Sequence, residues 1–76
     1  MVHAFIMVTV DTGHAEALVE MVRAFDHVSD ANVIAGNFDI VVEADAGEVY
    51  DVINSVATRI RGLDAVTDTK TYVCLE

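Results

Sequence analysis

The chain has 76 residues, the length of one small domain, and carries 13 acidic side chains against 4 basic ones. A net charge of −9 repels phosphate backbones, so we expect no direct binding to nucleic acid, and a single cysteine, Cys74, excludes an internal disulfide. No apolar run reaches the ~18 residues of a membrane span, and Met1-Val2-His3 lacks the charged start of a signal peptide, so the sequence predicts a cytoplasmic protein.

Two compositional features indicate how the chain assembles and in what environment it works. An apolar fraction of 54% is high for a small chain without a disulfide, which favours burial of apolar surface in an oligomer. The acidic surface, with Lys70 as the single lysine, favours adaptation to high salt; an ordinary acidic domain is the alternative.

The first half of the chain predicts a strand, a helix and a second strand. Apolar residues alternate over Val2–Val10, which is typical of a strand, and Asp11-Thr12-Gly13 then breaks the chain and can cap a helix. Apolar side chains recur at helical spacing from Ala15 to Phe25, and Asp26-His27 ends that helix. The second strand is predicted over Val28–Ala35.

Gly36-Asn37 predicts a tight two-residue hairpin between the second strand and a third strand over Phe38–Ala44. Gly36 can adopt the positive φ that such a turn requires. An aromatic ring, a carboxylate and free backbone groups lie together here, a combination that can hold a small zwitterion. Asp39 would face its ammonium, and backbone N–H groups its carboxylate; a role for Asp39 in capping the turn is the equal alternative.

The second half repeats the pattern. Asp45 and Glu48 form a candidate capping box, with Asp45 at the N-cap. Helical spacing of apolar residues then continues from Val49 to Leu63, with Gly62 as a plausible end, and the last strand is predicted over Val66–Leu75.

The element order is therefore βαββαβ, and Phe25-Asp26-His27-Val28-Ser29-Asp30 is echoed by Leu63-Asp64-Ala65-Val66-Thr67-Asp68. Two split βαβ units predict an α+β ferredoxin-like sandwich, with a four-stranded antiparallel sheet, the first and third strands central and two helices on one face. Residues 1–76 are expected to form one domain. The first and last strands are apolar on both faces, so we expect two sheets to pack back to back in a dimer.

Most candidate chemistry fails on spacing. His3, His14 and His27 fall on separate elements, so no metal site is predicted and ordinary histidines are favoured. No histidine is predicted beside Cys74, which is better explained as strand material than as a nucleophile. Arg59 and Arg61 suit a helix C-terminus. Thr67, Thr69 and Thr71 share one strand face, which matters only if that face meets the Asp39 turn of a neighbouring subunit.

The chain resembles the small-molecule-sensing domain of the Lrp/AsnC regulators over essentially its whole length. The matching features are Gly13, Val28, the Val33–Asp39 segment where the family has Gly-Asp/Asn/Ala-Tyr/Phe-Asp, and Ile60–Val66 with Thr69-Lys70-Thr71 for the family's Gly-Val-xx-Thr-x-Thr ending. The resemblance implies a ferredoxin-like domain that dimerises through its sheets and often forms a ring of dimers. It also implies amino-acid binding between dimers, with Gly36, Asn37, Phe38 and Asp39 as ligand candidates and Thr69 and Thr71 as weaker ones.

Typical members carry a helix-turn-helix of roughly 50–60 residues before this domain. This chain starts at the first strand, so a stand-alone, homo-oligomeric sensor without cofactor is expected, acting on transcription through full-length Lrp/AsnC regulators. The alternative is a small cofactor-free enzyme, because dimeric ferredoxin-like domains also serve as monooxygenases and isomerases. Only His3, Asn32 and Tyr72 are available for it, and they contain no evident acid/base pair.

Overall fold

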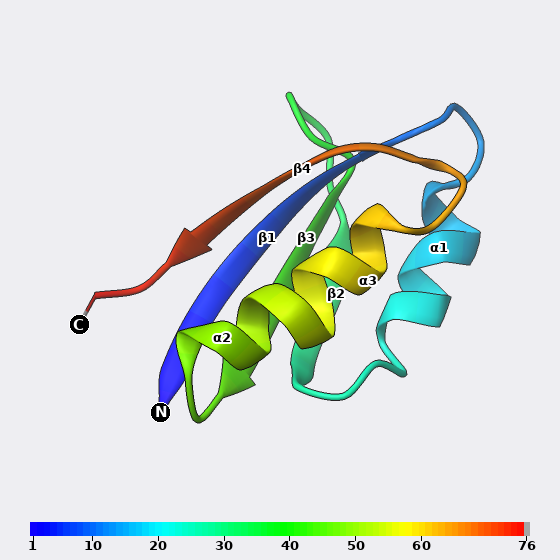
Figure 1. The fold of residues 1–76 in the computed structure, drawn as a ribbon. Helices are drawn as coiled ribbons and strands as arrows, with labels where there is room; N and C mark the ends of the chain where they lie inside the picture. Colours follow the sequence, from blue (N-terminus) through cyan, green and yellow to red (C-terminus); the bar gives the residue numbers. More distant parts are fainter. Residues whose placement is uncertain (76) are drawn as a thin grey trace.

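The computed structural model describes residues 1–75 and has the predicted βαββαβ order, which confirms the ferredoxin-like fold (Figure 1). The strands are β1 (Val2–Val10), β2 (Val28–Val33), β3 (Ile40–Ala46) and β4 (Val66–Val73). The first helix is α1 (Ala15–Val22). The second is one helical run composed of α2 (Val49–Asp51), a π-helical segment η1 (Val52–Ala57) and α3 (Thr58–Arg61).

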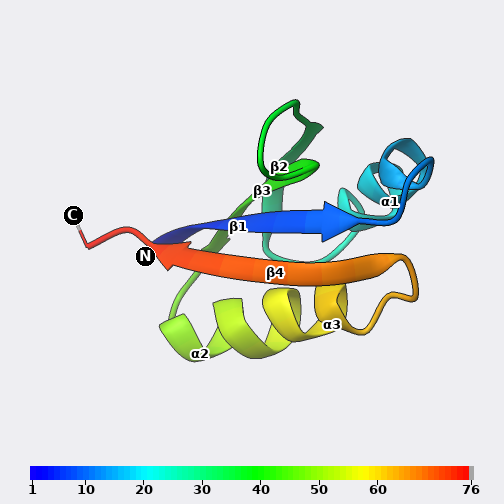
Figure 2. The same ribbon diagram turned by 90° about the horizontal axis from the view of Figure 1, so that it is seen from above.

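The four strands of the described chain form one antiparallel sheet in the order β2-β3-β1-β4. The predicted central strands, β1 and β3, are therefore central, and β2 and β4 are the edges. The helices lie on one side of this sheet (Figures 1 and 2). Ile6 of β1 pairs with Val42 of β3 on one side and with Thr71 of β4 on the other. In this register, the side chains of paired residues point to the same face of the sheet.

The core lies between the sheet and the helices. Alternate residues of β1 and β3 are buried, and Ile6, Val8 and Val42 have no exposed surface. They pack against Val22 of α1 and Ile60 of α3, which are also fully buried. Within residues 1–75, every buried position is hydrophobic, so the helix-covered side of the sheet is an apolar core.

The predicted capping box is wrong. Asp45 belongs to β3, where it pairs with His3, and the N-cap of α2 is Glu48, which makes no side-chain cap bond. The sequence rule failed because β3 continues to Ala46, so Asp45 lies within the strand and its carboxylate bonds His3.

Several predicted boundaries extend too far. Helix α1 ends at Val22, and the Phe25 N–H then bonds the Val22 carbonyl at 3.0 Å in a tighter turn. Phe25 lies beyond the end of the helix, but its ring still packs on the core, which explains why the apolar pattern continues to this residue. The second and last strands end two residues earlier than predicted, at Val33 and Val73. The first strand has the predicted bounds.

The sequence echo is a structural repeat. The Val28 N–H bonds the Phe25 carbonyl at 3.3 Å, and the Val66 N–H bonds the Leu63 carbonyl at 3.0 Å. Each half therefore turns from helix to strand with the same backbone hydrogen bond. Equivalent residues of the two turns are 38 positions apart, as Phe25 and Leu63 are.

Among residues 1–75, no helix combines the length and apolar character that crossing a membrane would require.

Candidate functional site

The segment that joins β2 to β3 is a six-residue loop, Ile34–Asp39, and the predicted two-residue hairpin is wrong. The last paired residues are Val33 and Ile40, and the Ile34 N–H donates to the Asp39 carbonyl at 2.9 Å. That bond closes the loop outside the ladder and leaves residues 35–38 as its tip. The tip projects beyond the end of the sheet, at the top of Figure 1.

Asp39 fixes the base of this loop. Its N–H donates to the Val8 carbonyl at 2.9 Å, and its Oδ2 accepts the Val10 N–H at 2.9 Å. The carboxylate therefore extends the β1–β3 pairing past its last residue pair; it binds the backbone of β1, whereas the capping role considered from the sequence was to its own turn. An ionised carboxylate has about four lone-pair sites, so one N–H bond leaves acceptor capacity for a second partner.

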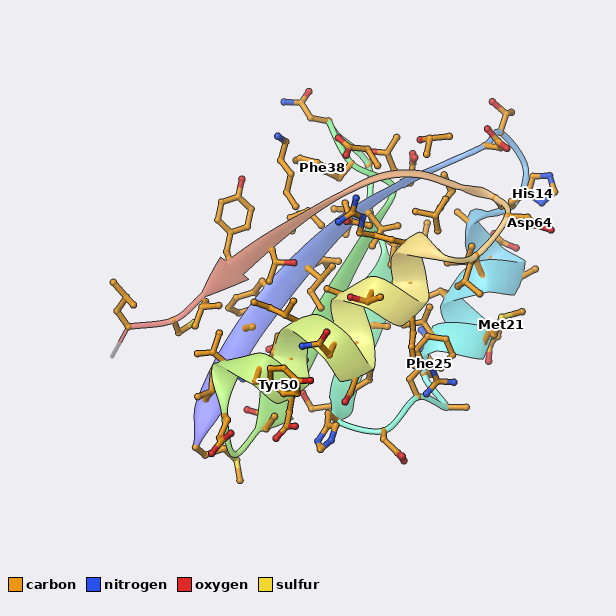
Figure 3. The ribbon with its side chains drawn as sticks, in the orientation of Figure 1. His14, Met21, Phe25, Phe38, Tyr50 and Asp64 are labelled. Atoms are coloured by element: carbon orange, nitrogen blue, oxygen red, sulfur yellow. The ribbon has the colours of Figure 1, made fainter. Side chains whose placement is uncertain are left out.

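The tip presents the other three candidates to solvent to different degrees. Gly36 and Asn37 are exposed, whereas Phe38, which is labelled in Figure 3, is half-buried. Gly36 has a φ of +148°, and a Cβ built there would meet nothing within 4 Å. Glycine is therefore favoured by the backbone conformation and not by a close neighbour.

Thr69 and Thr71 do not join the loop within one chain. They lie on β4, and β1 separates that strand from β3 and the loop. Val8 pairs with Ile40 on one side and with Thr69 on the other, so Thr69 is two strand spacings, or about 10 Å, from the end of the loop. Thr69 is half-buried and Thr71 exposed.

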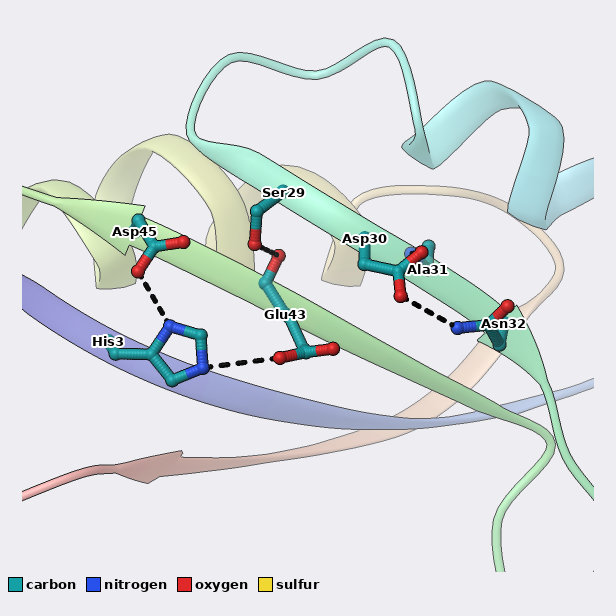
Figure 4. A network of polar contacts seen from close by, with 7 residues as sticks. All are labelled: His3, Ser29, Asp30, Ala31, Asn32, Glu43 and Asp45. Carbon is teal, nitrogen blue, oxygen red and sulfur yellow. Dashed lines mark hydrogen bonds and ion pairs between the residues drawn. The ribbon is translucent and has the colours of Figure 1, made fainter.

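A polar cluster that the sequence analysis missed lies on the open face of the sheet (Figure 4). His3 Nδ1 lies 2.6 Å from Asp45 Oδ1, and His3 Nε2 lies 3.2 Å from Glu43 Oε1. The ring meets that of Phe5 edge-on, with centroids 5.0 Å apart and planes at 90°. The available signal was the alternation of polar residues along β3, but it becomes informative only once β3 is paired with β1 in register.

The two carboxylates change how His3 titrates. The hydrogen bond to Asp45 is the main cause that raises the pKa of His3 above its ordinary value, and the negative charges of Asp45 and Glu43 add to it. The same hydrogen bond lowers the pKa of Asp45. The imidazolium form of His3 is therefore favoured, because that form has a hydrogen on each ring nitrogen to donate.

Strand pairing also corrects the expectation that no histidine lies beside Cys74. The Cys74 N–H donates to the His3 carbonyl at 2.8 Å, so the two backbones are adjacent. Both ring nitrogens of His3 already face carboxylates, and the Cys74 thiol is exposed and free. The cluster is thus an ion-paired histidine and not a thiol–imidazole pair. The described residues also contain no group of three or more His, Cys, Asp or Glu side chains arranged to hold a metal ion.

Comparison with known proteins gives a family match over nearly the whole chain. Residues 3–76 match the model of the Lrp/AsnC ligand binding domain. No curated protein matches the chain.

Solved structures give the same fold. A hypothetical protein, PHS023, from Pyrococcus horikoshii is 25% identical with a TM-score of 0.90, over 100% of this chain and 92% of that one. TTHA0845 from Thermus thermophilus is 22% identical with a TM-score of 0.92, over 100% and 95%. A transcriptional regulator from Neisseria meningitidis, NMB0573, solved as a complex with L-Met, is 18% identical with a TM-score of 0.75. This chain is covered to 99% in that match and spans 50% of the regulator.

Proposed function

The chain belongs to the Lrp/AsnC ligand-binding domain family, and from this premise we propose that it is a non-enzymatic regulatory module that binds an amino acid or a related small metabolite. The proposed site is the Ile34–Asp39 loop. Transcriptional regulation would follow through assembly with full-length regulators of the same family.

The observation that carries this proposal is the fixed base of the loop. Three hydrogen bonds through Asp39 hold it: N–H to Val8, carbonyl from Ile34 and carboxylate from Val10. A loop held in this way loses less conformational entropy when a ligand binds than a free loop does. The exposed tip at Gly36 and Asn37 then offers backbone groups next to an anchored carboxylate.

An α-amino acid matches this arrangement. Its ammonium would donate to the Asp39 oxygen that does not bond Val10, and its carboxylate would accept from backbone N–H groups of the tip. The half-buried Phe38 ring would contact the apolar part of the ligand. The L-Met complex of the Neisseria regulator supports this class of ligand.

We further propose that the site is completed between copies of the chain in an even-numbered oligomer. Within one chain the loop tip is open, and Thr69 and Thr71 lie across β1 from it. Threonine hydroxyls from a neighbouring copy would supply donors and acceptors that a zwitterion needs on its open side.

The helix-covered face gives no support to the alternative of a cofactor-free enzyme. Such an enzyme requires polar groups that converge in a pocket between sheet and helices. In the described part of the chain, the buried positions there are all hydrophobic, and His3 lies on the other face.

The test is Asp39→Asn. Asparagine keeps an acceptor for the Val10 N–H, so the free energy of unfolding should change little. The charge-assisted bond to an ammonium is lost, which costs roughly 1.5–3 kcal/mol, or about 10- to 100-fold in affinity. Isothermal titration calorimetry with amino acids, beginning with L-Met, measures this.

Asp26→Asn is the matched control, because it removes the same charge at an exposed position of another turn. It should bind like the wild type. Wild-type affinity in Asp39→Asn, or no binding of any amino acid to the wild type, would show that the assigned site is wrong.

A further inference from the structure

A groove of about 310 Å³ lies between α1 and the turn that joins α3 to β4. Leu18 and Met21 of α1 form one side, and Leu63 with Ala65 forms the other. His14 and Asp64 also line it, and they lie together at one end while Met21 lies further along α1 (Figure 3). The groove is thus apolar along its length and polar at one end. It shares no residue with the Ile34–Asp39 loop.

Backbone hydrogen bonds hold both walls in place. The Asp11 N–H donates to the Ala65 carbonyl at 2.8 Å, which ties the segment before α1 to the turn before β4. The Leu63 N–H bonds the Ile60 carbonyl at 3.1 Å, and the His14 N–H bonds the Asp11 carbonyl at 3.1 Å. The groove is therefore formed before any ligand arrives, as most small-molecule sites are.

The repeat within the chain shows what occupies the equivalent place in the other half. There, the guanidinium carbon of Arg59 lies 4.1 Å from the centroid of the Phe25 ring. The residues 38 positions from these two are Met21 and Leu63, which line the groove. In one half, the Arg59 guanidinium, carried on its aliphatic stem, lies over the Phe25 ring. Leu63, the equivalent of Phe25, has no aromatic face, so the carboxylate of the neighbouring Asp64 is the group there that can pair with a cation. In the other half, Met21 is 53% exposed and the space is open.

From this comparison we propose that the groove is a second ligand site, which binds a small organic cation with a short aliphatic stem, of the guanidinium or alkylammonium class. The stem lies on Leu18, Met21 and Leu63, and the cationic head lies at Asp64. The net charge of −9 raises the local concentration of cations and favours such a ligand over an anion.

The probe is n-butylguanidinium, which has the head group and nearly the stem length of the Arg59 side chain. Its neutral counterpart of nearly the same shape is n-butylurea. Both are titrated into the full, isotopically labelled chain, with ionic strength held constant, and amide chemical shifts are followed by NMR. We expect saturable shifts confined to residues around 14–21 and 63–65, with a dissociation constant of about 1 mM. Butylurea should bind about two- to fivefold more weakly, because the ion pair at Asp64 is exposed.

Variants locate the site. Ala17→Leu adds a good helix former at an exposed groove position, and Met21→Arg copies the residue of the other half; either should abolish the saturable shifts without unfolding α1. Asp64→Asn should remove the preference for the cation. Asp26→Asn, at the equivalent position of the other repeat, should leave that preference unchanged.

The proposal fails if the shifts do not saturate, if butylurea binds as well as butylguanidinium, or if Ala17→Leu binds like the wild type. It also fails if Ala17→Leu lowers the mass of the assembly, because the groove would then be an interface between copies. Asp39→Asn should bind butylguanidinium normally, so the groove and the amino-acid loop can fail independently.

Discussion

The side chains of β1 have different neighbours on the two faces of the sheet. On the helix-covered face, Ile6 and Val8 of β1 are fully buried among apolar neighbours. On the open face, His3, Phe5 and Met7 are half-buried, and His3 is paired with carboxylates of β3. The covered face supplies the core. The open face combines apolar surface with groups whose charge depends on pH and whose interactions are screened by salt. We therefore expect substitutions on the covered face to lower the free energy of unfolding under all solution conditions. Substitutions on the open face should have effects that depend on pH, salt or protein concentration.

The strongest test of this difference uses neighbours in β1. Ile6→Ala should lower the free energy of unfolding by about 2–5 kcal/mol, because it leaves a cavity in the core. Met7→Ala should cost about 1 kcal/mol or less in dilute protein, because its side chain is half-buried without the helices above it. Urea unfolding at low protein concentration measures both. Equal losses in the two variants would contradict the assignment of the faces.

The open face is also where we expect copies of the chain to meet. Light scattering coupled to size exclusion should give a dimer or a larger even-numbered assembly. Phe5→Glu puts a carboxylate on the open face, opposite Tyr72 on one side and Glu43 on the other, and should lower the mass of that assembly. Ile53→Glu makes the same chemical change at an exposed position of the helical run and should not. A wild-type monomer at micromolar concentration would contradict back-to-back packing of the sheets.

Salt should affect the molecule as a whole by a smaller amount. Thirteen carboxylates repel one another across a small surface, and molar salt shortens the Debye length to about 3 Å. The melting temperature should therefore rise between dilute buffer and molar KCl. Glu43→Gln and Asp26→Asn both remove one charge, but only Glu43 pairs with His3, so Asp26→Asn should stabilise the protein more at low salt. A melting temperature that does not respond to KCl would contradict adaptation to high salt.

The sequence predicted the features that depend on residues close together in the chain. The alternation over Val2–Val10 gave the bounds of β1, and the echoed turns gave the repeat. The Asp45 capping box failed because a motif of four residues does not include the partner strand, where His3 lies. The length of the Ile34–Asp39 loop was missed for the same reason, since Asp39 bonds to Val8 and Val10, about 30 positions earlier.

The sites were predictable to different extents. Asp39 was singled out from its place beside Gly36-Asn37, and its two possible roles could not be separated without the backbone of β1. The His3 cluster depends on register, which no single strand encodes. The open groove depends on Arg59 covering Phe25 in one half while Met21 remains exposed in the other, and that is a tertiary contact.

The smallest expected effect is the pH dependence contributed by His3. Its pKa is raised in the folded chain above the ordinary 6.5, chiefly by the hydrogen bond to Asp45, so the folded state holds this proton more tightly than the unfolded state. The stabilisation is fully present below pH 6.5 and is lost as the pH rises through the folded-state pKa. Asp45 has the opposite sign: its pKa is lowered from 3.8, so its contribution is present above that pH and is lost as the pH falls through the lower folded-state value. The His3–Asp45 pair should therefore stabilise the fold most between about pH 4 and 6.5.

Urea unfolding at pH 5.5 and 8.5 should show that the wild type loses more stability than His3→Gln over this interval. All other ionisable groups are the same in both proteins, so the difference between them isolates the cluster. Equal losses would mean that the carboxylates of β3 do not hold His3 in its charged form.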